Sequence, residues 1–187
     1  DLTSINEAFG MLLAGKLSEK EFLELENKVM PTYGSCSFLG TANSMCCLAE
    51  AIGMSLPGCA TIPAVMAARM RVGQETGRRI VGLIGEGLNC RKVITEKSVE
   101  NACRVIFAMG GSTNIILPLT AIAYEAGIDL GMDFYDRIAE STPHLAKVFP
   151  AAPENVVDFH NAGGVPALMR EMLPLLNGDT PTVSGKS

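Results

Sequence analysis

Apolar residues recur at intervals of three and four along most of the chain, and strict alternation of apolar and polar residues is nearly absent. Such spacing places apolar side chains on one face of an α-helix. The segment from Thr41 to Met54 is a clear case, because its apolar residues share a face and the stretch Ser-Leu-Pro-Gly follows them. The pattern therefore predicts that helices dominate.

Further helices are expected between the proline- and glycine-rich positions. The segment 62–87 opens with Pro63, which suits a first helical turn, and its inward-facing candidates are Met66, Met70, Ile80 and Leu83. Gly127 suits a left-handed helix end. The sequence predicts shorter helices at 114–125, 133–141 and 156–161, and another from Pro166 onward. A further helix is expected to be capped by Thr95 or Ser98. Its apolar residues lie on one face, and they are Val99, Ala102, Cys103 and Ile106. Two short strands are candidates as well, at Arg79 to Ile84 and at Val93 to Thr95.

Composition and charge narrow the class of protein. At 187 residues and 48% apolar content the chain can bury a core of one domain, or two at most. A net charge of −5 without a dense Lys/Arg run argues against nucleic acid or an anionic membrane as the main partner, and Arg78-Arg79 is interpreted as a solvated helix face. The sequence shows neither an apolar run long enough to span a membrane nor a signal peptide, so a cytoplasmic setting is expected.

The six cysteines lack the spacing of a disulfide framework and are interpreted as reduced thiols. Cys36 differs from the others, because it lies between Gly34 and Gly40 on a loop of small residues that leads directly into the helix at Thr41. The positive end of that helix would favour a thiolate. Two functional interpretations follow, a metal or cluster ligand and a nucleophile; the alternative is a small packing residue, as expected for Cys46, Cys47 and Cys103.

The stretch Gly-Gly-Ser-Thr-Asn at 110–114 lies between two predicted helices. Ser112, Thr113 or Asn114 can cap the second helix and leave backbone amides for a carboxylate or phosphate, although a simple capped turn explains the pattern equally well. Neither His144 nor His160 has another potential metal ligand at a suitable spacing. Each is expected to be hydrogen-bonded within the protein or exposed to solvent. The ending Gly-Lys-Ser lacks the earlier glycine of a phosphate-binding loop.

Seven blocks together carry a resemblance to a known family. In order they read GSCSFLGTANSM, EAIGMSLPG, TEKSVENA, AMGGSTN, LTAIAYEAGIDL, DFHNAGGVPALM and TVSGK. They resemble the dihydroxy-acid dehydratase and phosphogluconate dehydratase family over nearly the whole chain. The resemblance implies a hydro-lyase that converts a 2,3-dihydroxy carboxylic acid, either a branched-chain precursor or a sugar acid, to a 2-keto acid.

The resemblance also implies cofactors and a fold. Members of this family carry an iron-sulfur cluster held by three cysteines, of which Cys36 matches the third, and a magnesium ion; they are expected to form homodimers. One iron without a protein ligand acts as a Lewis acid on the departing hydroxyl. Ser112, Thr113 and Asn114 are the candidate substrate-binding residues. The implied fold class is α/β, helix-rich with few short strands, within the large amino-terminal dehydratase domain.

Some of the family's machinery does not match any part of the chain. The other cluster cysteines, the acidic magnesium ligands and the serine base are expected outside it, so residues 1–187 are interpreted as a single fragment of the large domain that is inactive alone. Pro118 stands where the family usually has histidine. Two alternatives stay open: a non-catalytic helical module derived from the family, and an enzyme with Cys36 as nucleophile, for which only two histidines are available as base.

Overall fold

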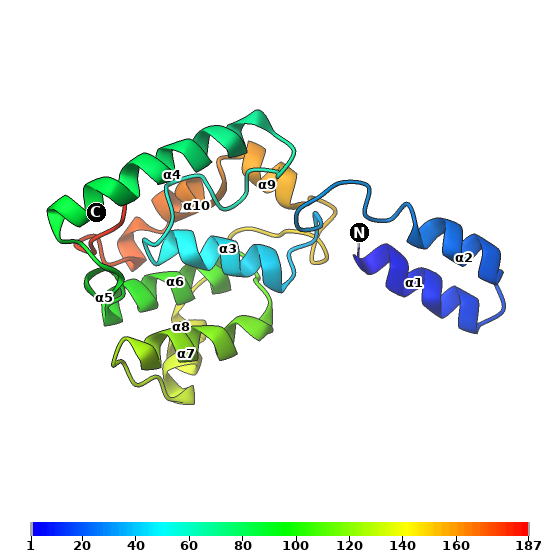
Figure 1. Cartoon of the computed structure of the whole chain (residues 1–187). Helices are drawn as coiled ribbons and strands as arrows, with labels where there is room; N and C mark the ends of the chain where they lie inside the picture. Colours follow the sequence, from blue (N-terminus) through cyan, green and yellow to red (C-terminus); the bar gives the residue numbers. More distant parts are fainter. Residues whose placement is uncertain (1, 187) are drawn as a thin grey trace.

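The computed structural model describes residues 2–186, which form helices joined by loops and contain no strand. Figure 1 shows their arrangement. The elements are α1 (Leu2–Leu13), α2 (Glu19–Glu26), α3 (Thr41–Ala51), α4 (Ala67–Glu86), α5 (Cys90–Val93), α6 (Glu96–Ala108), the 3₁₀ turn η1 (Thr113–Ile115), α7 (Ile116–Glu125), α8 (Met132–Ser141), α9 (Val156–Asn161), α10 (Gly164–Glu171) and η2 (Leu173–Leu175).

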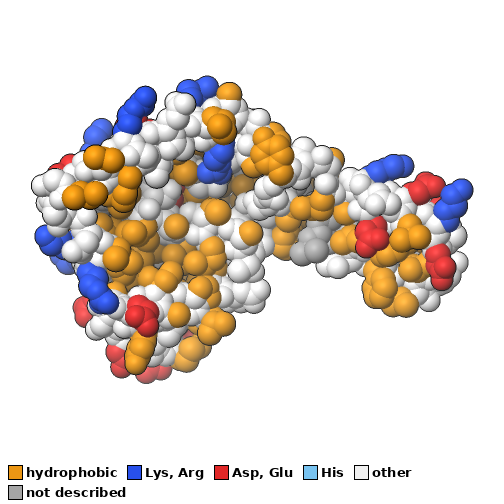
Figure 2. Space-filling model, in the orientation of Figure 1, with side chains coloured by type: hydrophobic (Ala, Val, Ile, Leu, Met, Phe, Trp, Pro, Cys, Tyr) orange, Lys and Arg blue, Asp and Glu red, His pale blue; other side chains and the backbone are white. Residues whose placement is uncertain are grey.

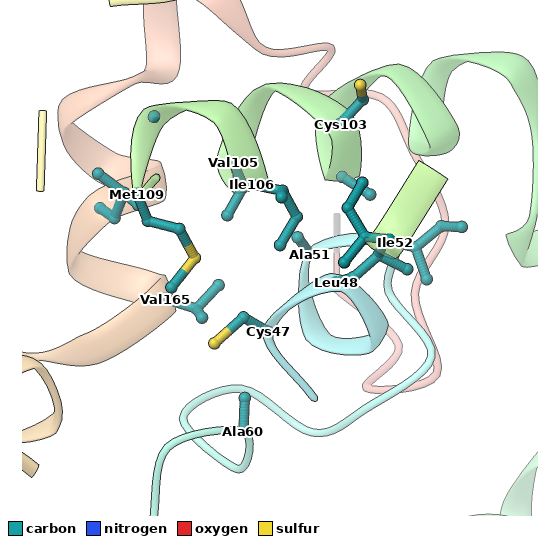
Figure 3. Packing of buried hydrophobic residues seen from close by; sticks show 14 of the residues in the cluster. Cys47, Leu48, Ala51, Ile52, Ala60, Cys103, Val105, Ile106, Met109 and Val165 are labelled. Atoms are coloured by element: carbon teal, nitrogen blue, oxygen red, sulfur yellow. The ribbon is translucent and has the colours of Figure 1, made fainter. Parts of the chain in front are cut away.

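Helices α3 and α6 pack against each other at the centre of the body, and α7, α8 and α10 pack against this pair (Figure 1). The predicted stripe on α6 is confirmed, because Val99, Ala102, Cys103 and Ile106 are all buried. Figure 3 shows Leu48 and Cys47 of α3 below α6, in the same buried cluster as Ile106 and Met109. Full burial of an aliphatic side chain contributes about 1.5–3 kcal/mol, so this pair of helices supplies the rigid base on which the loops at their ends are mounted.

Side-chain caps and glycines define the helix ends, and two of them were predicted. Thr95 caps α6 through a reciprocal pair of hydrogen bonds with Ser98, and Asn155 caps α9 in the same way with Asp158. Gly127 ends α7 with a φ of +82°, which confirms the predicted left-handed position. The predicted helices at 41–54, 133–141 and 156–161 are confirmed within a few residues.

The two predicted strands are wrong. Arg79 to Ile84 lies inside α4, and Val93 to Thr95 spans the end of α5 and the extended cap of α6. A short apolar run does not distinguish a strand from a buried helix, and here the helix continues to Gly87, whose φ of +62° closes it. The helix-rich class is confirmed. The label α/β fits residues 2–186 only loosely, because they contain helices and no strand.

Helix α4 is shorter and more exposed than its sequence pattern predicts. It begins at Ala67, because residues 59–66 form successive turns. Of the four side chains expected to face inward, Leu83 is buried, whereas Met66, Met70 and Ile80 are 39%, 72% and 56% exposed. Figure 2 shows that apolar side chains are common on the visible face of the molecule and that most of the Lys and Arg side chains seen there lie near its outline.

Helices α1 and α2 form a hairpin that lies apart from the body (Figure 1). A capping box at Ser18 starts α2, and the rings of Phe9 and Phe22 pack with centroids 6.1 Å apart. The segment that follows the hairpin returns to the body and contains Cys36. No helix within residues 2–186 combines the length and apolar character that crossing a bilayer requires.

The buried thiols of the central helix pair should be chemically inert. Burial raises the pKa of both Cys47 and Cys103 to about 12. At pH 8 we therefore expect iodoacetamide to label the exposed Cys46 and Cys90 rapidly in the folded protein and to leave Cys47 and Cys103 unlabelled, because the thiolate is the reactive form. Mass spectrometry of the labelled peptides checks this. Labelling of Cys47 at the rate of Cys90 would contradict the packing described here.

Candidate functional site

Cys36 is half-buried on the loop that connects the α1–α2 hairpin to α3. The loop approaches the body closely at Gly34, where φ is +102° and a Cβ would lie 2.6 Å from the Cβ of Ala64. Only glycine combines this φ with this approach. Two backbone hydrogen bonds secure the same loop, from Val156 N–H to the carbonyl of Ser37 at 3.0 Å and from Leu39 N–H to that of Phe149 at 2.9 Å.

The first turns of α3 connect the Cys36 loop to the loop at 110–114. The hydroxyl of Ser44 accepts the backbone N–H of Ser112 at 2.9 Å, and the hydroxyls of Thr41 and Ser112 lie 3.2 Å apart. The amide of Asn114 donates to the Thr41 hydroxyl at 2.9 Å. On the other side of the same turn, Asn43 hydrogen-bonds to the loop around Cys36. Two loops separated by more than 70 residues are thus held by one helix end.

Two cavities open beside Cys36. The smaller, about 560 Å³, lies between the α3 start and the 110–114 loop and is lined by Cys36, Thr41, Ser112, Thr113 and Asn114 among others. The larger, about 1050 Å³, lies on the other side of Cys36 and has mainly apolar walls from residues 60–65 and the end of the α1–α2 hairpin. The structure therefore brings all four sequence-predicted site residues around one space.

The smaller cavity is suited to an anion. Helix α3 has Gly40 as its N-cap, which has no side chain to bind the first N–H groups of the helix, and residues 40–43 line the cavity. The unpaired amides and positive dipole of a helix start attract carboxylate and phosphate groups. The hydroxyls of Thr41 and Ser112 add adjustable hydrogen-bond partners at the same wall.

The wall of the larger cavity is held by a buried carboxylate that the sequence analysis missed. Glu50 of α3 accepts the N–H of Gly58 at 2.6 Å and that of Ala60 at 2.7 Å, one on each oxygen. Arg69 binds the carbonyl of Ile62 at 2.6 Å and contacts the Cys59 sulfur at 3.3 Å. Burial raises the pKa of Glu50, while these two N–H donors and the charge of Arg69 oppose that rise.

Gly111 should be needed for the close approach of the 110–114 loop to α3. A Cβ there would lie 2.6 Å from Ile106 Cγ2 and 3.2 Å from Ser44 Oγ. We expect Gly111→Ala to push the loop away from Ser44 and to lower the free energy of unfolding by about 1–3 kcal/mol. Gly85→Ala is the control, because nothing lies within 4 Å of that position on α4 and alanine favours helices. Equal unfolding midpoints in urea for the two variants would contradict this packing.

The remaining cysteines and histidines separate into distinct environments. Cys47 and Cys103 are core residues as predicted, but Cys46 is exposed and lines the larger cavity with Cys36. His144 is exposed, and His160 is half-buried with its Nδ1 3.0 Å from the Thr61 hydroxyl, so both agree with the prediction. The contributions of Thr41, Asn43 and Ser44 were missed, although three polar residues in the first helical turns after a glycine were the available signal.

The amino-acid sequence matches one family model throughout. Residues 1–187 match the model described as "Dihydroxy-acid/6-phosphogluconate dehydratase N-terminal". The chain belongs to this family. It is 44% identical over 187 residues to the dihydroxy-acid dehydratase of Methanococcoides burtonii, 46% over 187 residues to dihydroxy-acid dehydratase 1 of Methanosarcina acetivorans, and 43% over 188 residues to that of Carboxydothermus hydrogenoformans. Each match covers 100% of this chain and 34% of the relative, so the chain spans about a third of their length.

The family's motif blocks meet at the site. GSCSFLGTANSM contributes the Cys36 loop and the start of α3, while AMGGSTN contributes the opposite wall. Pro118, the departure from the dehydratase pattern, is the third residue of α7. The N–H groups of a first helical turn have no partner within the helix, so this proline fits α7 without the loss of a helical hydrogen bond.

The residues around Cys36 fit one ligand of an iron-sulfur cluster rather than a complete set. The thiol borders two open cavities and stands among small side chains, which leaves room for a bulky group. Among residues 2–186, no three His, Cys, Asp or Glu side chains gather at a spacing that would hold a metal ion. A cluster held at Cys36 would therefore need further thiolates from outside residues 2–186.

Proposed function

We propose that the site around Cys36 is part of a hydro-lyase that dehydrates a 2,3-dihydroxy carboxylic acid to a 2-keto acid. The observation that carries the proposal is the meeting of Cys36 with the start of α3 and the 110–114 loop around one cavity. The relatives named dihydroxy-acid dehydratase, at 43–46% identity, support this reaction class. This reaction class includes both branched-chain precursors and sugar acids as substrates.

In this proposal Cys36 supplies one thiolate to an iron-sulfur cluster. The cluster supplies Lewis acidity toward the hydroxyl that leaves C3. The chain holds Cys36 at the border between the two cavities, with a glycine-containing loop before it and a rigid helix after it. This placement lets a thiolate face a bulky partner while its backbone stays anchored to α3.

The substrate carboxylate is proposed to bind at the smaller cavity. The amides at the start of α3 attract the negative charge. Within the Thr41–Ser112 pair, the hydroxyl that accepts the hydrogen bond can donate its own proton to the carboxylate. Asn114 holds the Thr41 hydroxyl from the far side, and Ser44 holds the backbone of Ser112. Such a rigid arrangement orients the C2–C3 bond of the substrate relative to Cys36. Thr113, exposed at the rim, contributes to the wall.

The magnesium ion and the base that removes the C2 proton are proposed to be held by residues outside this chain, and the assembled enzyme to be a homodimer. The reaction balances as loss of water: a proton leaves C2, hydroxide leaves C3, and the enol tautomerises to the ketone. The residues of this chain bind and orient the acid while those steps occur.

The test is an assay of the intact natural polypeptide after anaerobic iron-sulfur reconstitution. We expect 2-keto acid to form from at least one member of a panel of branched-chain and sugar-derived 2,3-dihydroxy acids, and none to form from the 2-hydroxy analogues that lack the leaving group. A protein that carries a full cluster and yet converts no member of the panel would contradict the proposed reaction and favour a non-catalytic module.

A further inference from the structure

Asn43 lies beneath the loop that carries Cys36 and contacts it on both sides of the cysteine. The side chain is 6% exposed. Its Nδ2 donates to the carbonyl of Cys36 at 2.7 Å and to that of Phe38 at 2.7 Å, while its Oδ1 accepts the hydroxyl of Ser35 at 2.7 Å. One amide thus satisfies three polar groups over four consecutive loop residues.

The position of Asn43 also relates it to the cavities. Within residues 2–186, Cys36 and Asn43 are the two that line both the smaller and the larger cavity. Asn43 belongs to the rigid start of α3, whereas the loop before it is rich in small and exposed residues. A short side chain fixed by a helix can therefore set the backbone conformation of a loop that has little packing of its own.

We propose that Asn43 is the positioning residue for Cys36: by binding the carbonyls of Cys36 and Phe38 it fixes the direction in which the thiolate meets the iron-sulfur cluster. This inference rests on the proposed function, because it assigns Cys36 to the cluster. Residues that support a metal ligand typically change metal affinity by about 10–100-fold when they are replaced. Asn43 acts through the cysteine backbone and does not itself contact the metal.

The informative substitution is Asn43→Asp. Aspartate has nearly the same shape and still accepts the Ser35 hydroxyl, but it places an oxygen against the two carbonyls where the amide donated. Cys36 should then lose its fixed direction even though the volume of the side chain is unchanged. Asn43→Ser, which is too short to reach the loop, is the second variant in case the aspartate prevents folding.

Asn101 offers a matched control on α6. It is also buried, at 2% exposure, donates its Nδ2 to the carbonyl of Asn177 at 2.9 Å and accepts the Asn177 N–H at 2.8 Å. It lines neither cavity. Asn101→Asp therefore repeats the same chemical change, an amide donor lost against a carbonyl, away from Cys36.

The experiment measures cluster binding by the intact natural polypeptide after anaerobic reconstitution. Iron per polypeptide, visible absorption and the rate of cluster loss in air are compared for wild type, Asn43→Asp, Asn43→Ser, Asn101→Asp and Cys36→Ala, with circular dichroism as the check on folding. We expect both Asn43 variants to lose the cluster at least about tenfold faster than wild type, and Asn101→Asp to match wild type.

The outcomes separate this inference from the proposed function. If Cys36→Ala loses its cluster while the folded Asn43 variants keep wild-type spectra and lifetimes, the positioning role is overturned and the proposed function stands. If Cys36→Ala keeps a wild-type cluster, or if wild type assembles none, the assignment of Cys36 is overturned and the inference with it. An equal effect of Asn43→Asp and Asn101→Asp on cluster lifetime would reduce Asn43 to a structural residue.

Discussion

Replacing Cys36 with alanine is expected to remove the cluster and to lower dehydration by more than about a hundredfold, the upper range for residues that only support a metal ligand. The reason is positional, because Cys36 is the thiol that borders the smaller cavity together with Ser112 and Asn114. Iron content, visible absorption and the rate of keto-acid formation are measured on wild type and variant reconstituted side by side.

Cys46 provides the control for this substitution. It is exposed and lines the larger cavity with Cys36, but it does not border the smaller one. We expect Cys46→Ala to keep the iron content and activity of wild type. If the two variants lose iron equally, Cys46 would be a second ligand, and the larger cavity, which both thiols line, would become the candidate cluster site.

Replacing Glu50 with alanine is expected to have the largest effect on stability. The change leaves the N–H groups of Gly58 and Ala60 without their acceptors, at a cost of about 1–3 kcal/mol each, and leaves Arg69 without its neighbouring charge. We therefore expect the free energy of unfolding to fall by about 2–6 kcal/mol, measured by urea denaturation at pH 7. An unchanged midpoint would show that the 55–61 loop does not depend on Glu50.

The pH dependence of the same site tests the role of Arg69. Because burial raises the pKa of Glu50 above its ordinary 4.5, this carboxyl contributes stability that is present below about pH 4.5 and is lost as pH rises through the folded-state pKa. Removal of Arg69 takes away a charge that favours the ionised form. Arg69→Met should thus destabilise the protein more at pH 7 than at pH 4.

The control for Arg69 is Arg78, whose ion pair with Glu75 at 3.3 Å is exposed on both sides. Exposed pairs contribute about 0–1 kcal/mol, so Arg78→Met should shift unfolding little at either pH. If Arg69→Met loses the same stability at both pH values, the effect of Arg69 arises from its hydrogen bonds to the 59–62 segment and not from its charge.

Local signals in the sequence were sufficient to predict most helices. The spacing of apolar residues on α6 predicted its buried face, and Thr95 predicted where that helix starts. Gly127 predicted the end of α7. These features depend on residues within one or two turns of each other, where propensity and capping decide the outcome. The strand predicted at 79–84 was wrong, because a short apolar run does not distinguish a strand from a helix.

The candidate site could be predicted only in part. Cys36 and residues 112–114 were found as two separate motifs, and the structure places them at one cavity. The contacts that join them, from Thr41 and Ser44 to the 110–114 loop, connect residues about 70 positions apart. Glu50 was also missed, because a glutamate in an amphipathic helix gives no sign of which backbone amides it will meet.

The measurement that tests the central assignment most directly is the protection of cysteines in the intact natural polypeptide, wild type in sequence. The apoprotein and the reconstituted protein are alkylated anaerobically under native conditions, and each cysteine peptide is quantified by mass spectrometry. We predict that Cys36 is alkylated in the apoprotein and protected after reconstitution, while the exposed Cys90 is alkylated equally in both. Equal alkylation of Cys36 in apoprotein and in protein with a full complement of iron would contradict its role as a cluster ligand.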